Sequence, residues 1–473
     1  MTRVIVVGGT HSGVGKTTLS TALMAAYRRR GLTVQAFKVG PDFIDPTYHT
    51  AATGRPGRNL DGWMLDRATV LDIFERASSD SDLAIVEGVM GLFDGASGTS
   101  DEGSTAEIAK WLGAPVLLVI DGAALARSAA AIVHGYETFD PSLGVVAVIA
   151  NNLAGEAHYA YIQQAIKASS CKASIIGWLK RDPAVTIPDR HLGLFLAGEV
   201  ASKKFLNRLA DWVEQTVDLD LLLKLSTSKA ASGTATIRAG SPRPGSDRQP
   251  LISGDRTAQK GRVRIGVAKD SAFCFYYQDN LDLLEGLGAQ LIFWSPINEA
   301  LPSGLNGLYF GGGYPELFAS ALSDNCAARN EVRWFINRGG AVYAECGGLM
   351  YLTQAIVDTH GVEYPMTQVF PVKCRVQDRL AALGYVEVEG THSNPIIGEG
   401  ERIRGHQYRY SSIDPMPDSI VCGYESHSPS RPAAVREGYL VNNCLASYVH
   451  LHFMSNQGFA ARWVQLCRTG VTT

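Results

Sequence analysis

Short apolar runs alternate with longer amphipathic stretches over residues 1–225. The runs are rich in Val, Ile and Leu at consecutive positions, which is typical of parallel strands that helices cover on both faces. The predicted strands are Arg3–Val7, Val34–Val39, Leu83–Glu87, Val116–Asp121, Val145–Asn151 and Ser174–Leu179. The segments between them are long enough for crossover helices, so this half of the chain predicts a doubly wound parallel sheet of the α/β class.

The pattern changes at residue 226, where the chain becomes small, polar and rich in Gly and Pro, without a helical or strand period. This composition predicts an exposed linker. Beyond the linker we expect a strand at Val263–Ala268, a helix at Asp279–Leu287 and a strand at Gln290–Trp294. The predicted organisation is an α/β domain over 1–225, a linker over 226–261 and a second α/β domain over 262–473.

The 473 residues include 43 Lys and Arg against 46 Asp and Glu, a formal net charge of −3. This balance argues against the basic surface that non-specific nucleic-acid binding needs. No apolar run approaches the roughly 18–20 residues that span a bilayer, and the N-terminus lacks a signal-peptide pattern. The eight cysteines form no C-x-x-C pair, so we expect neither a disulfide framework nor a zinc ribbon. These features predict a soluble cytoplasmic enzyme with no nucleic-acid or membrane partner.

A glycine-rich loop follows the first predicted strand, because residues 8–18 read GGTHSGVGKTT. Glycines at a strand-to-helix turn let backbone N–H groups converge on phosphate oxygens, and the helix N-terminus favours anions. In such a motif the lysine reaches the β- and γ-phosphates and the following hydroxyl binds Mg²⁺. The strict pattern has Gly where this chain has Thr10. The loop predicts an ATP or GTP site formed by Thr10, Ser12, Gly13, Gly15, Lys16 and Thr17.

Four acidic residues lie at or just beyond the ends of two predicted strands. Asp42 and Asp45 follow the second strand, and Glu87 and Asp94 end or follow the third. In a doubly wound sheet these positions face the ligand crevice, beside the phosphate loop. Carboxylate oxygens suit Mg²⁺, which also binds substrate phosphates. The sequence therefore predicts an acidic set that handles Mg²⁺ and phosphate.

A cysteine in the second half lies at a predicted strand-to-helix turn, because residues 339–350 read GGAVYAECGGLM. Such a turn exposes a nucleophile, here Cys346, and the helix N-terminus is expected to lower its thiol pKa. Backbone N–H groups of Gly347 and Gly312 are the expected oxyanion donors. A cysteine nucleophile needs a base, for which His450 is the candidate. We interpret the other seven cysteines as structural.

Motifs in the same order along nearly the whole chain resemble the cobyrinic acid a,c-diamide synthase family, including its hydrogenobyrinic acid members. The N-terminal half is similar to dethiobiotin synthetase-type ATPases, and the C-terminal half is similar to class I glutamine amidotransferases. The motifs are GTHSGVGKTT, FKVGPDFIDP, NLDGWM, VEGVMGLFDG, IPDRHLGL (187–194), FGGGYPE, AECGGLMYL and ASYVHLHF.

The resemblance implies a reaction that uses ATP, glutamine and Mg²⁺. Glutamine is hydrolysed at Cys346, with His450 as base, and its ammonia replaces the phosphate of a corrinoid acyl phosphate, at the c-carboxylate first and the a-carboxylate second. The implied residues are Thr17, Asp42 and Glu87 for Mg²⁺, Lys38, Asp42, Asp45 and Asp94 for the substrate and acyl phosphate, and Asn151 for adenine. The sequence leaves the oligomeric state open, with a homodimer as one candidate.

Two positions depart from the related patterns. Class I amidotransferases usually have Glu two residues after the catalytic His, where this chain has His452, so a dyad or a different orienting group is expected. Within residues 405–410, Gln407 and Arg409 replace the Glu and His of the family pattern, which argues against a glutaminase role for this stretch.

Other readings stay open at this point. A related enzyme that amidates nickel sirohydrochlorin has a similar pattern. Cobyric acid synthase is disfavoured because Gly-Pro-Asp (40–42) follows the second strand instead of Gln-Asn-Met. A phosphate-loop switch protein with an inactive second domain is a different class, against which the intact Cys346 and His450 argue. A dethiobiotin-type carboxylase needs no ammonia source, so the second half argues against it.

Overall fold

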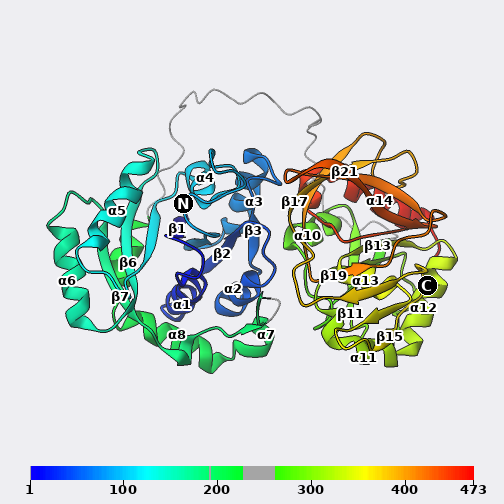
Figure 1. Ribbon diagram of the computed structural model, residues 1–473, viewed down its shortest axis with the longest axis horizontal. Coiled ribbons are helices and arrows are strands. Elements are labelled where there is room, and N and C mark those ends of the chain that lie inside the picture. The colour runs from blue at the N-terminus through cyan, green and yellow to red at the C-terminus, as the bar shows by residue number, and fades with distance from the viewer. Residues whose placement is uncertain (1, 191–192, 227–261) are drawn as a thin grey trace. The chain divides into compact units, whose positions relative to one another are not determined.

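The computed structural model describes residues 2–190, 193–226 and 262–473 (Figure 1). The chain divides into two compact units, residues 1–238 and 239–473. The expected linker lies outside the described residues except for Ser226, and so do His191 and Leu192 of the IPDRHLGL motif. Among the helices described, none has the length and apolarity needed to span a membrane.

The first unit is built on a seven-stranded sheet in the order β3-β2-β4-β1-β5-β6-β7, with every neighbouring pair parallel. The strands are β1 (Arg3–Gly9), β2 (Val34–Val39), β3 (Arg58–Leu60), β4 (Leu83–Glu87), β5 (Val116–Asp121), β6 (Val145–Leu153) and β7 (Ser174–Lys180). The six strands predicted from the sequence are confirmed to within two residues. The edge strand β3 was not predicted, because three residues are too short to show a period.

Helices connect these strands and cover the sheet (Figure 1). They are α1 (Lys16–Arg29), α2 (Asp45–Thr53), α3 (Arg67–Ser78), α4 (Thr105–Leu112), α5 (Ser128–Phe139), α6 (Glu156–Lys167), α7 (Ala197–Val200), α8 (Lys203–Glu214) and α9 (Leu219–Leu225), with a short 3₁₀ turn at Pro183–Val185 and a two-residue strand pair, β8 (Asp189–Arg190) and β9 (Gly193–Leu194). Helix α1 packs Leu19, Leu23 and Ala26 into a buried cluster with residues of β1, β5 and α8. This spacing is the apolar stripe of a helix that lies on a sheet.

The second unit contains a ten-stranded sheet in the order β11-β10-β12-β13-β22-β21-β20-β17-β18-β23. The strands β10 to β13 and β22 pair in parallel, and the others pair antiparallel. Their bounds are β10 (Val263–Ala268), β11 (Ala289–Trp294), β12 (Gly307–Phe310), β13 (Ala341–Glu345), β17 (Ala382–Gly390), β18 (Arg402–Arg409), β20 (Val421–Ser428), β21 (Arg431–Val441), β22 (Cys444–Ser447) and β23 (His450–Leu451).

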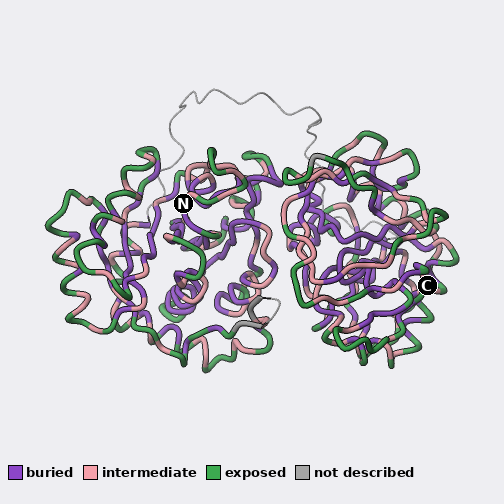
Figure 2. Tube along the Cα trace, viewed as in Figure 1, coloured by how far each residue is buried: buried purple, intermediate pink, exposed green. Residues whose placement is uncertain are grey.

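A second, four-stranded sheet and five α-helices complete the described part of this unit. The sheet has the order β15-β14-β16-β19. The bounds are β14 (Ala355–Val357), β15 (Glu363–Pro365), β16 (Lys373–Val376), β19 (Ser411–Ile413), α10 (Gln278–Gly286), α11 (Ala319–Asp324), α12 (Cys326–Asn337), α13 (Gly347–Leu352) and α14 (Gln457–Thr469), with 3₁₀ turns at Pro315–Phe318 and Phe453–Ser455. Figure 2 shows that the strands in the middle of each unit are buried, so the residues at their ends have a rigid base.

Candidate active sites

The loop between β1 and α1 has the backbone of an anion site. Gly13 and Gly15 have φ of 80° and 101°, which glycine adopts without a Cβ penalty. Among the described residues, no side chain caps the N-terminus of α1. Its first N–H groups are therefore left for a ligand, and phosphate is the ligand that such helix starts bind.

Lys16 is buried at the start of α1, and its Nζ donates hydrogen bonds to the carbonyls of His11 at 3.0 Å and Met90 at 2.5 Å. Burial, helped by the nearby charge of Lys38, lowers the pKa of Lys16 to about 8. The carbonyl contacts place the ammonium across the loop. A phosphate at the helix start would give this ammonium a negatively charged partner in place of neutral carbonyls.

A buried polar cluster lies next to the loop, at the ends of β2 and β4. Lys38 Nζ is 2.6 Å from Asp45 Oδ2 and 2.9 Å from Glu87 Oε1. The Thr17 hydroxyl donates to the same two oxygens, at 2.6 Å to Glu87 and 3.2 Å to Asp45. Two predicted carboxylates and the predicted hydroxyl thus meet around one ammonium.

The carboxylates of Asp42, Asp45 and Glu87 outnumber the single ammonium of Lys38 that lies among them. Burial, together with Asp42 and Glu87, raises the pKa of Asp45 well above its usual range. Burial acts in the same direction on Glu87, but Lys38, His49 and Thr17 outweigh it and hold the pKa of Glu87 below its usual range. The pKa of Lys38 is raised despite burial, because Asp45 and Glu87 favour its charge. A further cation would find a favourable potential here.

The donor set fits Mg²⁺, because Thr17, Asp45 and Glu87 present oxygen atoms only and their hydrogen bonds converge on one point. The resemblance implied Asp42 as a ligand. In the structure Asp45, not Asp42, contacts Thr17, while Asp42 Oδ1 accepts the N–H groups of Ile44 and Asp45 at the start of α2. The direction of each carboxylate depends on this turn, which the sequence did not reveal.

His49 is a member of the cluster that sequence reasoning missed. It is fully buried, and its Nε2 lies 2.6 Å from Glu87 Oε2, on the side of the carboxylate away from Thr17 and Lys38. The signal was present in the sequence. His49 follows Asp45 by four residues, so both lie on one face of α2.

The other predicted residues of this unit lie around the same loop. Asn151 of β6 lies opposite Asp121 in the last residue pair of β5 and β6. Its Nδ2 donates a hydrogen bond to the carbonyl of Val14 at 2.8 Å. The backbone carbonyl of Thr10 accepts a hydrogen bond from the Tyr136 hydroxyl at 2.8 Å, and Ser12 is exposed. Asp94 Oδ2 accepts the N–H of Gly91 at 2.9 Å, and its charge favours the charged form of Lys16. All of them stay candidates for nucleotide or substrate binding.

In the second unit, Cys346 lies between β13 and α13 with φ of 48° and ψ of −99°. A positive φ is strained for a residue with a side chain, and such strain is typical of nucleophile turns. The Cys346 N–H donates to Ser447 at 2.7 Å, and the Gly348 N–H donates to Gly311 at 3.1 Å. The turn is thereby tied to the loop after β12 and to the segment that leads to His450.

The thiol itself departs from expectation. Burial, with the nearby charge of Glu316, raises the pKa of Cys346 to about 12. The N–H of Gly347 acts in the expected direction but is outweighed. The expectation of a lowered pKa was wrong for the ligand-free chain, because desolvation of the buried thiol dominates. Thiolate formation therefore needs a base close by.

Glu345 links the nucleophile strand to the strand of the predicted base. Its Oε1 accepts the N–H of Leu451 at 2.9 Å and the Tyr343 hydroxyl at 2.7 Å. Burial raises the pKa of Glu345 to about 8. The residue before Cys346 thus holds the residue after His450, a link that sequence reasoning did not predict.

His450 is buried, and burial lowers its pKa to about 3, so the imidazole is neutral in the ligand-free chain. A Cβ added to Gly312 would lie 2.3 Å from His450 Cε1, so this glycine packs directly against the ring. Gly312 also accepts the N–H groups of Cys274 and Phe275 at its carbonyl. The predicted oxyanion residues Gly347 and Gly312 both border the segments that carry Cys346 and His450.

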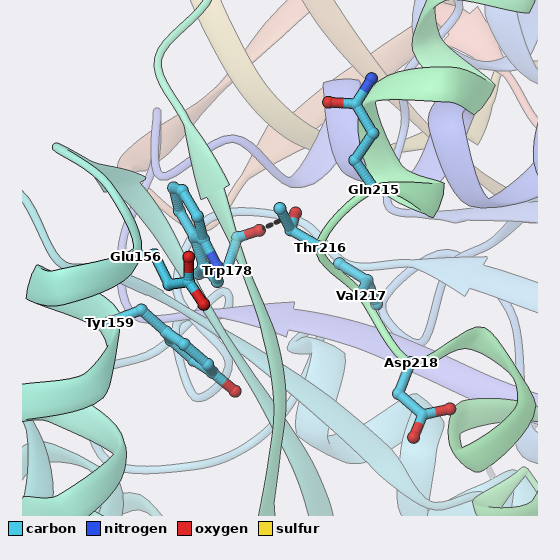
Figure 3. Close-up of a pocket in the computed structure, with 7 residues that line it drawn as sticks. All are labelled: Glu156, Tyr159, Trp178, Gln215, Thr216, Val217 and Asp218. Carbon is cyan, nitrogen blue, oxygen red and sulfur yellow. Dashed lines mark hydrogen bonds between the residues drawn. The ribbon is translucent and has the colours of Figure 1, made fainter.

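Two further features lie apart from these residues. His134, Glu137 and Cys171 bring ligand atoms within 4.8 Å of one another at the surface, but Glu137 already accepts the N–H groups of Lys172 and Ala173. A shallow pocket of about 440 Å³ lies beside β7, α6 and the turn before α9 (Figure 3). Tyr159 and Trp178 stack along its wall. None of the predicted residues lines this pocket.

Two family models match the chain, one within each unit. Residues 5–195 match the CobQ/CobB/MinD/ParA nucleotide binding domain, and residues 264–458 match the CobB/CobQ-like glutamine amidotransferase domain. Among solved structures, a glutamine amidotransferase matches 43% of this chain and 98% of its own at 16% identity and a TM-score of 0.31.

Curated relatives match almost end to end. Proteins named cobyrinate a,c-diamide synthase are 41% identical in Priestia megaterium, over 98% of this chain and 97% of the relative, and 42% identical in Syntrophotalea carbinolica, over 98% of both. A relative of the same name in Thermoplasma volcanium is 39% identical over 98% of this chain and 97% of its own. The chain therefore belongs to the cobyrinate a,c-diamide synthase family, with a nucleotide-binding domain followed by a glutamine amidotransferase domain.

Proposed function

We propose that this protein amidates the c- and then the a-carboxylate of cobyrinic acid or hydrogenobyrinic acid, with ATP and glutamine as co-substrates. The observation that carries the proposal is the presence, in one chain, of two features. One is a phosphate loop beside a buried carboxylate cluster, and the other is a strained cysteine whose preceding residue, Glu345, accepts the N–H of the residue that follows a buried histidine. Relatives of this name over 98% of the chain support it.

The first unit is proposed to activate the carboxylate. A carboxylate is a poor electrophile, because amide formation would expel oxide. Transfer of the γ-phosphoryl group of ATP to one carboxylate oxygen gives an acyl phosphate and ADP. Ammonia then attacks the acyl carbon, phosphate leaves and a proton is released. Positioning and charge neutralisation dominate phosphoryl transfer, so the α1 N-terminus and Lys16 would hold the phosphates.

Mg²⁺, when bound, would neutralise charge on these phosphates, and Thr17, Asp45 and Glu87 are the residues that would hold it. Lys38 pairs with both Asp45 and Glu87, so its single charge partly balances the two carboxylates in the ligand-free chain. Asp42 and Asp94 stay proposed for the substrate side, and Asn151 for adenine. Lys38 is also proposed to contact the reacting carboxylate.

The second unit is proposed to make ammonia. His450 takes the proton of the Cys346 thiol, the thiolate attacks the glutamine amide carbon, and the protonated base delivers its proton to the leaving ammonia. Water then hydrolyses the thioester to glutamate. Gly347 and Gly312 N–H groups are the proposed donors to the oxyanion. Cys346 and His450 are both buried, and the exclusion of bulk water around them favours unprotonated ammonia over ammonium.

The test separates the two halves. Cys346→Ala should abolish glutamine-dependent amide formation, while a high concentration of ammonium chloride at pH 8.5 should restore it, since the first unit is intact. Lys16→Ala should abolish amide formation with either nitrogen source but leave glutamine hydrolysis measurable. Failure of ammonia to rescue Cys346→Ala, with ATP binding intact, would contradict the proposal, and absence of glutamate release by the unaltered protein would favour a switch protein instead.

A further inference from the structure

A row of side-chain rings in contact with one another lies beside His450 in the second unit. His406 of β18 is the register partner of His450 across the antiparallel pair β18 and β23. Their imidazole centroids are 5.0 Å apart and their planes are inclined by only 18°. Because directly opposite residues of neighbouring strands project to the same face, the sheet itself imposes this stack.

His406 is anchored in turn by Tyr277, at the start of α10. The Tyr277 hydroxyl and His406 Nδ1 are 3.0 Å apart, and both side chains are buried. Burial lowers the pKa of His406 well below its usual range, so the ring is neutral. Its Nδ1 can then accept a hydrogen bond from the Tyr277 hydroxyl. The Tyr277 ring packs on His452, with centroids 4.5 Å apart. His452, Tyr277, His406 and His450 thus form one continuous row.

The contacts around His450 show which part of this residue the row of rings could hold in place. The backbone next to His450 is fixed, because Glu345 accepts the N–H of Leu451. That bond fixes the backbone and not the imidazole ring, whose last torsion is broad in histidine. The ring lies against Gly312 and His406. The residue two positions on, where class I enzymes usually have an orienting Glu, is His452. Within the described chain neither of its ring nitrogens has a hydrogen-bond partner, and the ring packs on Tyr277 instead.

We propose that His406 is a positioning residue for glutamine hydrolysis: its ring, anchored by Tyr277, holds His450 in the orientation in which it takes the proton of Cys346. The proposal rests on the proposed glutaminase function of the second unit. It assigns the orienting task to an aromatic stack and a buried tyrosine. His406 contacts the proposed base from the neighbouring strand, so its proposed effect on catalysis is exerted through His450.

Three variants separate the stack from the hydrogen bond. His406→Ala removes the ring from beside His450. The double variant Tyr277→Phe with His406→Phe keeps a ring at both positions and removes both groups of the Tyr277–His406 hydrogen bond together, so neither group of that bond is left without the other. His392→Ala, at an exposed histidine of the same unit, is the matched control. Glutamate release is measured over a range of glutamine concentrations, and ammonia-dependent amide formation is measured in parallel.

The proposal predicts that His406→Ala lowers kcat for glutamine hydrolysis by about 10- to 100-fold and changes KM by less than about threefold, since misorientation of a catalytic group acts on the reacting state. The double phenylalanine variant should keep kcat within about threefold of the unaltered protein, because the stack survives. Ammonia-dependent activity should match the control in every variant, which shows that the first unit is intact, and thermal unfolding of each variant verifies that the second unit folds.

Two results would overturn the positioning role. The first is a kcat for His406→Ala within twofold of His392→Ala. The second is a double phenylalanine variant as inactive as His406→Ala, because the stack alone would then not suffice. His450→Ala is measured beside them. If it keeps full glutaminase activity, the proposed function of the second unit fails as well; if it is inactive while His406→Ala is normal, only the positioning role fails.

Discussion

Gly312→Ala perturbs the glutaminase site by one methyl group. The backbone of Gly312 does not have a positive φ, so alanine fits its conformation. The added Cβ would lie 2.3 Å from Cε1, 3.2 Å from Nδ1 and 3.3 Å from Nε2 of His450. The N–H of residue 312 is retained, so a proposed oxyanion donor is not lost. The substitution therefore acts on the position of the imidazole ring.

The size of the effect follows from the contact. An ordinary carbon–carbon contact is about 3.5 Å, so the ring or the loop must move by about 1 Å. A displacement of that size in a catalytic group lowers the rate by about 100-fold, or about 2.7 kcal/mol in activation free energy. We expect kcat for glutamine hydrolysis to fall by this factor, measured by glutamate release. Ammonia-dependent amide formation in the first unit should be unchanged.

The matched control is Gly135→Ala. Gly135 lies within α5, and a Cβ there meets nothing within 4 Å, so the variant should hydrolyse glutamine at the normal rate. Thermal unfolding of both variants verifies that they fold. If Gly312→Ala hydrolyses glutamine within threefold of Gly135→Ala, then His450 is not the base, or its ring is free to move without loss, and the reasoning is refuted.

Three further predictions concern buried charges. Lys38→Met leaves Asp45 and Glu87 without their ammonium and should lower the free energy of unfolding by about 3–5 kcal/mol in urea denaturation; a loss below 1 kcal/mol would contradict the ion-pair cluster. Burial raises the pKa of Glu345 from 4.5 to about 8, so the folded chain keeps a proton that the unfolded chain releases, and stability from this group is lost as pH rises from 5 to 8. The unaltered protein should therefore lose stability relative to Glu345→Gln as pH rises over this range, as measured by the free energy of unfolding of both proteins. If the two free energies of unfolding change equally with pH, Glu345 is ionised in the folded chain. Without glutamine, Cys346 should react with iodoacetamide at pH 7.5 at least about tenfold more slowly than exposed Cys326, as followed by peptide mass spectrometry, since its pKa is about 12; faster alkylation of Cys346 would show an activated thiolate.

The sequence predicted much of the fold because buried parallel strands are local apolar runs. β2, β4 and β5 have the predicted bounds, and the predicted helix 279–287 is α10, one residue earlier at each end. The small sheet of β14, β15, β16 and β19 was not predicted. Its strands are only three or four residues long, so no local period reveals them.

The sequence predicted which residues form the two sites better than it predicted the contacts between them. Glycine-rich turns after strands identified the loops of Lys16 and Cys346, because the backbone there needs special conformations. The contact of Thr17 with Asp45 instead of Asp42 depends on how one turn is capped. The sequence argued against a glutaminase role for residues 405–410, whereas the proposed role of His406 depends on His450, which is its neighbour only across the sheet. Pairings of this kind depend on register, which a single sequence does not display.

The most direct test of the account is the product of the whole reaction. The purified protein is incubated with Mg-ATP and glutamine, in parallel with cobyrinic acid, hydrogenobyrinic acid and nickel sirohydrochlorin, and each ring is analysed by mass spectrometry. We predict two acid-to-amide conversions on cobyrinic or hydrogenobyrinic acid, with formation of glutamate and ADP. Amides on nickel sirohydrochlorin alone, or no amide on any ring despite glutamate release, would contradict the proposed function.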